Sequence, residues 1–286
     1  IMNPLANLNG QILPLDEVRI SPLDRGFLFG DAVYEVLRVY HAKPWLEEEH
    51  FQRLERSLRE IRIHGVDVAR LRRRMHETIR AGGFGESTVY LQVTRGAAPR
   101  KHAFPADVAP LELLWVQEYH DTYRPLCESG CAVVTYPDIR WHRADIKSTN
   151  LLGNVLANQA AAEAGCSEAL LYLPDGTMTE ASHSTFFAVK NGALHTTPLK
   201  ANVLPSITRA FVVKLAQEAR VEIVERYVQR KELGEMDELF LVGTTCEVLP
   251  IVKVDGAPVR SGQPGPVTRQ LQTIYTEKVR AFVQGR

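Results

Sequence analysis

Apolar residues in the first half of the chain follow two different periods. An extended apolar run over residues 33–40 predicts a strand. Over residues 47–65 apolar side chains return every three or four positions, which predicts an amphipathic helix. A second helix is expected over 69–83, because it ends in a pair of glycines. Two further strands, 87–96 and 111–120, flank a polar loop. The first half therefore predicts a mixed α+β unit.

The second half is rich in hairpin signals. Apolar runs are joined there by Asp-Gly or Asn-Gly, the dipeptides that favour tight turns between antiparallel strands. These hairpins are predicted over residues 170–180, 186–196 and 251–259. The helices expected in this half cover residues 150–164, 206–220 and 268–284. We therefore expect a β-rich barrel or sheet with helices outside, and an α+β fold for the whole chain.

A polar segment predicts the link between two domains. Residues 118–126 read EYHDTYRPL and include Pro125, which disfavours regular structure. The 286 residues suffice for two domains of ordinary size. We expect a small N-terminal α/β domain over residues 1–120 and a larger C-terminal domain over 121–286. The larger domain would carry Lys147.

Composition excludes several classes of partner. The chain has 34 Lys+Arg and 34 Asp+Glu, so its net charge gives no general support for nucleic-acid binding. No apolar run approaches the roughly 20 residues that a membrane span needs. The N-terminus lacks the basic and apolar pattern of a secretory leader. The four cysteines lack the spacing of metal ligands, so no metal site is expected. We expect a cytoplasmic protein with reduced thiols.

Lys147 is the first candidate for chemistry. It stands between a strand-like stretch and a mostly uncharged helical run, where partial burial is expected. Burial lowers the pKa of a lysine and frees its amine to attack carbonyls. The structural alternative is a lysine whose stem is buried and whose ammonium reaches water. Local sequence leaves both interpretations open.

Other loops carry groups that suit a phosphorylated aldehyde cofactor. Such a cofactor needs a lysine, an anion-binding cradle and a partner for its ring nitrogen. Glu180 follows a predicted hairpin and could be that partner, although a carboxylate that caps a turn is the simpler interpretation. Ser206 and Thr208 begin a predicted helix, where backbone N–H groups suit a phosphate or an ordinary cap. Thr244 and Thr245 offer hydroxyls after a predicted buried strand.

The same segments resemble a known family. The chain is similar nearly end to end to the fold-type IV pyridoxal-phosphate aminotransferases, and within them to the D-amino-acid transaminases. The segments that carry the resemblance are DRGFLFGDAVYEVLRVY, EHFQRLERS, VTRGAAPRKHAFP, DIRWHRADIKSTNLLGNVLANQAA, TMTEASHSTFF, SITR and GTTCEVLPI. The resemblance implies a two-domain fold with a barrel-like C-terminal domain. It also implies pyridoxal 5'-phosphate as cofactor and a homodimer whose site lies between the domains and is closed by loops of the second subunit.

Residue roles follow from the resemblance by position. Lys147 looks like the Schiff-base lysine and proton shuttle, and Glu180 looks like the partner of the ring nitrogen. The residues that resemble the phosphate and cofactor contacts are Arg53, Ser182, Ile207, Thr208 and Thr244. Those that resemble the substrate-carboxylate trap of the D-specific branch are Tyr34, Arg100 and His102. From the residues alone, Arg100 and His102 would be a solvated basic loop.

The subfamily rests on fewer positions. Leu151 stands where branched-chain aminotransferases tend to have tyrosine, which favours the D-amino-acid branch. His183 and Thr185 replace the small residue and the asparagine that are common after the glutamate, which leaves the local hydrogen bonding and substrate range open. The expected reaction converts D-alanine and 2-oxoglutarate to pyruvate and D-glutamate by ping-pong kinetics. Alternatives are a branched-chain or (R)-amine transaminase, an aminodeoxychorismate lyase, and a protein that only binds the cofactor.

Overall fold

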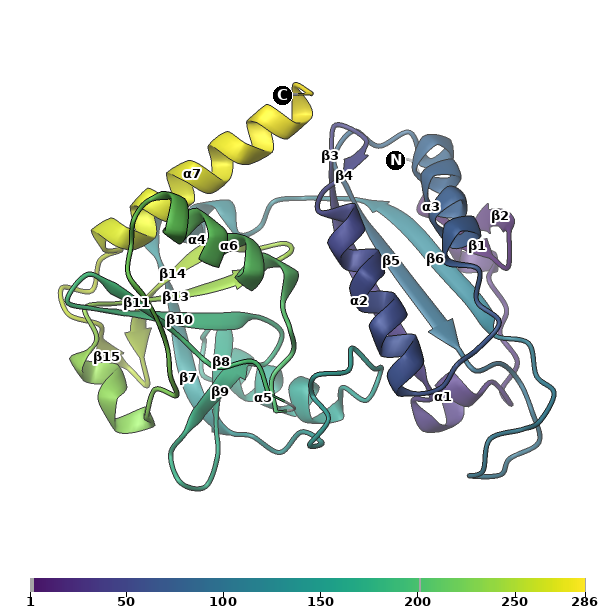
Figure 1. Ribbon diagram of the computed structural model, residues 1–286, viewed down its shortest axis with the longest axis horizontal. Helices are drawn as coiled ribbons and strands as arrows, with labels where there is room; N and C mark the ends of the chain where they lie inside the picture. Colours follow the sequence, from purple (N-terminus) through teal and green to yellow (C-terminus); the bar gives the residue numbers. More distant parts are fainter. Residues whose placement is uncertain (1–2, 201, 286) are drawn as a thin grey trace. The chain divides into compact units, whose positions relative to one another are not determined.

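The chain folds into two compact units (Figure 1). The computed structural model describes residues 3–200 and 202–285. The first unit runs to His120 and also includes Ile146–Asn150, and the second takes Asp121–Asp145 and the chain from Leu151 onward. Each unit is built on its own β-sheet.

The first unit contains a six-stranded antiparallel sheet in the order β2-β1-β6-β5-β3-β4. Its strands are β1 (Leu5–Leu8), β2 (Gln11–Pro14), β3 (Ala32–Tyr40), β4 (Lys43–Pro44), β5 (Ser87–Thr94) and β6 (Leu111–Glu118). Its helices are the 3₁₀ turn η1 (Leu15–Glu17), α1 (Arg25–Phe29), α2 (Glu47–Glu60) and α3 (Val68–Gly82). Both long helices were predicted from the sequence, α2 from its periodicity and α3 from the pair of glycines at its end.

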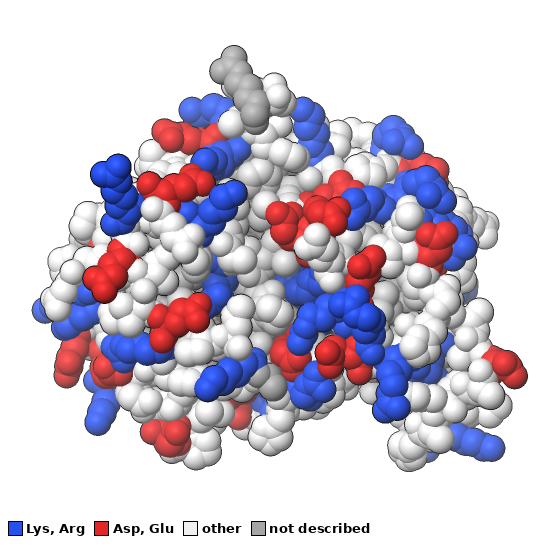
Figure 2. All heavy atoms as spheres, viewed as in Figure 1, with Lys and Arg blue, Asp and Glu red and all other residues white. Residues whose placement is uncertain are grey.

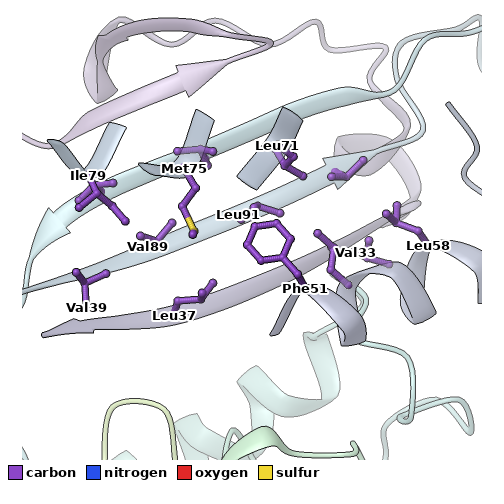
Figure 3. Close-up of a cluster of buried hydrophobic side chains, with 14 of the residues drawn as sticks. Val33, Leu37, Val39, Phe51, Leu58, Leu71, Met75, Ile79, Val89 and Leu91 are labelled. Carbon is purple, nitrogen blue, oxygen red and sulfur yellow. The ribbon is translucent and has the colours of Figure 1, made fainter. Parts of the chain in front are cut away.

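Helices α2 and α3 supply the core of this unit. In Figure 3 their apolar side chains point toward alternate residues of β3 and β5, as the two-residue period of a strand requires. Phe51 and Leu54 of α2 are buried, which confirms the predicted apolar face. Helix α2 ends at Glu60, so Ile61 caps the helix and is only partly buried.

The second unit is built on a nine-stranded mixed sheet in the order β12-β11-β10-β13-β14-β7-β8-β9, with β15 paired to β14. Its strands are β7 (Cys131–Pro137), β8 (Glu168–Tyr172), β9 (Met178–Ala181), β10 (Thr185–Lys190), β11 (Ala193–Thr196), β12 (Ile223–Glu225), β13 (Glu238–Gly243), β14 (Glu247–Val254) and β15 (Ala257–Pro258). Its helices are α4 (Arg124–Ser129), α5 (Leu152–Glu163), α6 (Ile207–Glu218), the 3₁₀ turn η2 (Arg230–Glu235) and α7 (Pro266–Val283).

Both faces of this sheet are buried. Along β10, Phe186 belongs to the cluster on one face, and Phe187 packs on the other face with side chains of α6 and α7. The sheet also curls, so that its two edge strands approach each other. Met178 N of the edge strand β9 donates to Val228 O at 2.9 Å, and Val228 lies three residues after the opposite edge strand β12. This is the β-rich, helix-covered half that the hairpin signals predicted.

The lysine segment differs from the domain prediction. We expected Lys147 to belong to the C-terminal domain, but Ile146–Asn150 packs with the first unit. The segment lies along the start of β3: Tyr34 N donates to Lys147 O at 3.0 Å, and Thr149 N donates to Ala32 O at 3.1 Å. These backbone bonds, and the burial of Ile146 in the first core, fix the segment to β3.

Charged side chains of both signs are interspersed over the surface in view (Figure 2). In the part of the chain that the structure describes, no helix is long and apolar enough to span a bilayer. Nor do the described residues contain a cluster of three or more His, Cys, Asp or Glu side chains that could hold a metal ion. All four cysteines are free thiols.

Candidate cofactor and substrate site

The predicted site residues fall into two groups, one in each unit. Those in the first unit are Tyr34, Arg53, Arg100, His102 and Lys147. Those in the second unit are Glu180, Ser182, Ile207, Thr208 and Thr244. Each group has its own geometry.

Lys147 lies against Tyr34 and is held by backbone contacts. Its Nζ is 4.3 Å from the centroid of the Tyr34 ring, and its backbone N–H donates to Ser57 Oγ at 3.3 Å. Three residues later, Asn150 Nδ2 donates to Gly30 O at 3.1 Å. Gly30 has a φ of 65°, and a Cβ there would lie 2.6 Å from Asn150 Oδ1, so this contact requires glycine. The lysine stands on an anchored backbone.

Arg53 belongs to a buried ion cluster between α2 and β3. Its Nε and Nη2 donate to the two oxygens of Glu35, each at 2.8 Å. His50 Nδ1 lies 2.7 Å from Glu35 Oε2. The structure thus pairs Arg53 with a strand residue 18 positions away along the chain. Arg53 is thus fixed in place by a bidentate carboxylate.

The charges of this cluster are coupled. Burial alone would raise the pKa of Glu35, but Arg53 and His50 hold that pKa at about 2. Burial lowers the pKa of His50, and the positive charges of Arg53 and Lys147 lower it further, against the opposing effect of Glu35. Lys147 and Arg53 therefore act on the same buried histidine, and the structure brings these two predicted site residues into one cluster with Tyr34.

Arg100 and His102 lie on the loop that joins β5 to β6, and both side chains contact Phe29 of α1. Arg100 Cζ is 5.3 Å from the centroid of the Phe29 ring, and the His102 ring centroid is 5.4 Å from it. Both predicted trap residues are exposed on this loop. The structure therefore brings them together on one aromatic ring, a contact that their spacing in the sequence did not predict.

Glu180 lies in β9 and is buried with Arg140. Arg140 Nη1 donates to Glu180 Oε1, while Arg140 Nε and Nη2 are bound by Asp138 at 2.9 and 2.7 Å. Leu204 N lies 3.3 Å from both Glu180 oxygens. Burial raises the pKa of Glu180, and Arg140 opposes this shift without cancelling it. Arg140 therefore favours the ionised form of a carboxylate that burial would otherwise neutralise.

Four predicted cofactor contacts lie at one edge of the second sheet. Pairing of Thr185 with Val242 and of Phe187 with Thr196 shows that β10 begins where β11 and β13 end. Ser182 precedes β10 at this edge, and Thr244 follows β13. Helix α6 starts at the same edge with Ile207 and Thr208, because Arg209 Nε in its first turn donates to Thr196 Oγ1 at 3.0 Å.

A buried glutamate organises the turn before β10. Glu168 is 1% exposed and accepts hydrogen bonds from Ser182 N at 3.1 Å, Ser184 Oγ at 2.8 Å and Ser182 Oγ. His183 Nδ1 lies 2.9 Å from Glu168 Oε2, and His183 Nε2 is 3.4 Å from Tyr123 OH. His183, which departs from the family pattern, thus binds the glutamate that shapes the turn of Ser182.

Comparison with known proteins decides the family. The family model described as amino-transferase class IV matches residues 32–254, which include every predicted site residue. This chain belongs to the class IV aminotransferases. The expected resemblance is confirmed, and the protein is a pyridoxal-phosphate-dependent aminotransferase with the two-domain fold-type IV architecture.

Several relatives share nearly the whole length of this aminotransferase. D-alanine aminotransferase of Staphylococcus haemolyticus is 37% identical over 274 residues, covering 95% of this chain and 96% of the relative. D-alanine aminotransferase of Bacillus licheniformis is 37% identical over 275 residues, covering 95% of each. Branched-chain amino acid aminotransferase of Escherichia coli superposes with a TM-score of 0.91 at 25% identity, covering 96% of this chain and 93% of that one. Branched-chain aminotransferase of Thermoproteus uzoniensis with norvaline has a TM-score of 0.88 at 26% identity, covering 98% and 95%.

The residues of this aminotransferase fit pyridoxal phosphate. Glu180 offers a buried carboxylate to a ring N–H, and the start of α6 offers backbone N–H groups that the helix itself cannot pair. The hydroxyls of Thr149, near Lys147, and Thr197, near the start of α6, are buried without a hydrogen-bond partner among the described residues. Buried hydroxyls are normally paired, so these two are open to a ligand or an ordered water.

Substitution of Arg140 should change the pH dependence of this aminotransferase. In Arg140→Gln only the N–H of Leu204 still opposes the effect of burial on Glu180, so the pKa of Glu180 rises further. If Glu180 must be ionised, activity disappears as the pH falls through its pKa, and the acid limb of kcat/KM moves to higher pH. Arg143→Gln is the matched control, because Arg143 pairs with Asp145 instead. An acid limb in Arg140→Gln that coincides with the wild type excludes this role.

Sequence reasoning missed Arg140, Asp138, Glu168 and Glu35. Each is a charged residue that is held away from solvent by its partners in the folded chain. Arg140 and Glu180, for example, are 40 positions apart in the sequence. Charged residues in strands and loops are mostly solvated, so their type alone gave no signal. The segment DIRWHRAD, which places two arginines shortly before Lys147, gave a hint of Arg140 and Asp138 only.

Proposed function

We propose that this aminotransferase acts on D-amino acids, converting D-alanine and 2-oxoglutarate to pyruvate and D-glutamate. The observation that carries the proposal is the 37% identity to D-alanine aminotransferases over 95% of the chain. The branched-chain aminotransferases of known structure share the fold at 25% and 26% identity, which supports the scaffold more than the substrate.

Lys147 is the proposed catalytic residue. When bound, pyridoxal phosphate supplies a carbonyl that takes up the substrate amine and a conjugated ring that accepts electrons from Cα. Lys147 would carry the cofactor and, once released, its Nζ would remove the proton from the substrate Cα. What supports this role is the anchored backbone of Lys147 and its place beside Tyr34.

Glu180 is proposed to bind the protonated ring nitrogen, and Arg140 is proposed to keep the Glu180 carboxylate ionised. For the phosphate we propose the start of α6, through Ile207 and Thr208, together with hydroxyls at the same sheet edge. Those hydroxyls are Thr208 and Thr244, and Arg53 is the proposed charged partner. Ser182, whose hydroxyl donates to Glu168, is proposed only as a further cofactor contact. Its bidentate bond to Glu35 supports a fixed orientation for the guanidinium.

Tyr34, Arg100 and His102 are proposed to bind the substrate carboxylate. A guanidinium binds a carboxylate in a bidentate fork, and a carboxylate held on one side directs the Cα–H of one enantiomer toward the lysine. The L enantiomer, held by the same groups, would present its side chain there instead. The contact of Arg100 and His102 with one ring supports their joint action.

We also propose that the protein is a cytoplasmic homodimer, as the family resemblance implies. Sedimentation of the purified protein over a range of concentrations measures the assembly. A monomer with full activity contradicts the dimer.

A single-turnover comparison tests the substrate proposal. We expect D-alanine to change the absorbance of the bound cofactor far faster than L-leucine does, because the trap would orient only the D isomer productively. Faster reaction with L-leucine supports the branched-chain alternative, and faster reaction with a chiral (R)-amine supports an amine transaminase. Release of 4-aminobenzoate from aminodeoxychorismate identifies the lyase, and cofactor binding without any reaction identifies a binding protein.

A further inference from the structure

Helix α1 is tied to the loop that carries Arg100 and His102. The buried Arg25, 3% exposed, donates through Nη1 to Lys101 O at 2.6 Å and through Nη2 to His102 O at 3.2 Å. Its Nε is bound by Asp31 Oδ2 at 2.8 Å. The guanidinium therefore bridges a carboxylate and the backbone of the loop, in the geometry that its planar fork favours.

The base of the same loop is fixed by the same carboxylate. Arg95, the first residue after β5, donates to Asp31 through Nε at 2.7 Å and Nη2 at 2.9 Å. Arg25 N donates to Gly96 O at 3.0 Å, and Ala98 N donates to Leu23 O at 3.3 Å. Both the start of the loop and its segment 101–103 are thus held by residues in and around α1.

Phe29, the last residue of α1, contacts the side chains of both predicted trap residues. Arg100 Cζ and the His102 ring lie 5.3 and 5.4 Å from its centroid, and Arg25 Cζ lies 4.9 Å from it. A cation within about 6 Å of an aromatic ring is attracted to its face. One ring therefore sets the spacing of the two side chains, while Arg25 sets the backbone between them.

We propose that Phe29 and Arg25 are positioning residues for recognition of the substrate carboxylate. Phe29 fixes the relative placement of the Arg100 and His102 side chains, and Arg25 fixes the loop that carries them. The inference rests on the proposed function of Arg100 and His102 as the carboxylate trap. Neither Phe29 nor Arg25 touches the substrate in this role, and both act through the loop.

Two amines that differ only by a carboxylate test the role of Phe29. D-Alanine without its carboxylate is ethylamine, so the ratio of their single-turnover rates isolates carboxylate recognition. Phe29→Leu should raise the D-alanine concentration needed for half-saturation roughly two- to thirtyfold, which is the range of one cation–π contact. The single-turnover rate with ethylamine should not change. Phe29→Tyr, which keeps the ring, should restore D-alanine. The matched control is Phe27→Leu on the same helix, because the Phe27 side chain is 76% exposed.

The outcomes separate this inference from the proposed function. Loss of D-alanine saturation in Arg100→Ala but not in Phe29→Leu overturns the positioning role and leaves the trap standing. No loss in Arg100→Ala overturns both. Equal losses for D-alanine and ethylamine in Phe29→Leu, with a lowered thermal midpoint, mean that Phe29 only stabilises the fold.

A double-mutant cycle tests Arg25 independently. Arg25→Lys keeps the positive charge beside Asp31, but a lysine cannot donate to two carbonyls with the geometry of the guanidinium fork. The D-alanine concentration needed for half-saturation should therefore rise roughly two- to tenfold. In an Arg100→Ala background the same substitution should add little, because the side chain that it positions is gone. Additive effects in the cycle show that Arg25 does not act through Arg100.

Discussion

Lys147→Ala should abolish transamination of D-alanine. The variant lacks the amine that would carry the cofactor and also the base that would remove the Cα proton. Loss of a positioned acid–base group alone slows an enzyme roughly 100- to 10,000-fold. Single-turnover absorbance of the bound cofactor and steady-state release of pyruvate measure the loss.

The cofactor should remain partly bound in this variant, because the proposed phosphate contacts at the start of α6 are intact. Lys200→Ala serves as the control, since Lys200 is an exposed lysine in the second unit. Turnover near the wild-type rate in Lys147→Ala rules out Lys147, and a loss of turnover in Lys200→Ala would then assign the role to Lys200.

Arg100→Ala should strongly weaken the binding of substrates that carry a carboxylate. Arg100 is exposed in this structure. If the substrate-loaded site excludes water from the pair, a carboxylate left without its bidentate partner costs roughly 2–5 kcal/mol, which is about 30- to 4,000-fold in affinity. We expect the KM values for D-alanine and 2-oxoglutarate to rise together and the preference for D- over L-alanine to narrow. Ethylamine, which has no carboxylate, should react at nearly the wild-type rate.

Steady-state kinetics with these four compounds measures the effect, and Lys101→Ala is the matched control on the same loop. The Lys101 side chain is exposed, and only its backbone carbonyl receives the bond from Arg25. Unchanged D-alanine kinetics in Arg100→Ala contradicts the carboxylate trap and, with it, the basis proposed for D selectivity.

Local patterns predicted the elements whose form depends on nearby residues. Asp175-Gly176 and Asn191-Gly192 do form the turns of the predicted hairpins, because a tight hairpin turn needs residues that tolerate positive φ. The apolar face of α2 packs on the first sheet because its side chains repeat with the helical period. Turn chemistry and periodicity act over a few residues, so both can be recognised in the sequence.

The motifs near Lys147 and Glu180 were recognisable because the family resemblance covers them. The arrangement of their partners was not. Arg140 meets Glu180 across 40 positions, and Arg25 meets Lys101 O across 76. No local period links residues so far apart, and the same charged residue types would serve equally well on a solvated surface.

The sequence by itself determined the hairpins, the amphipathic helices, the cofactor class and the residues that match the family. Only the tertiary structure decided that the lysine segment packs on β3, that Arg53 pairs with Glu35, and that Phe29 gathers the two loop residues. The physical reason is that a buried charge needs a partner, and its partner is chosen by which strands and helices become neighbours when the chain folds.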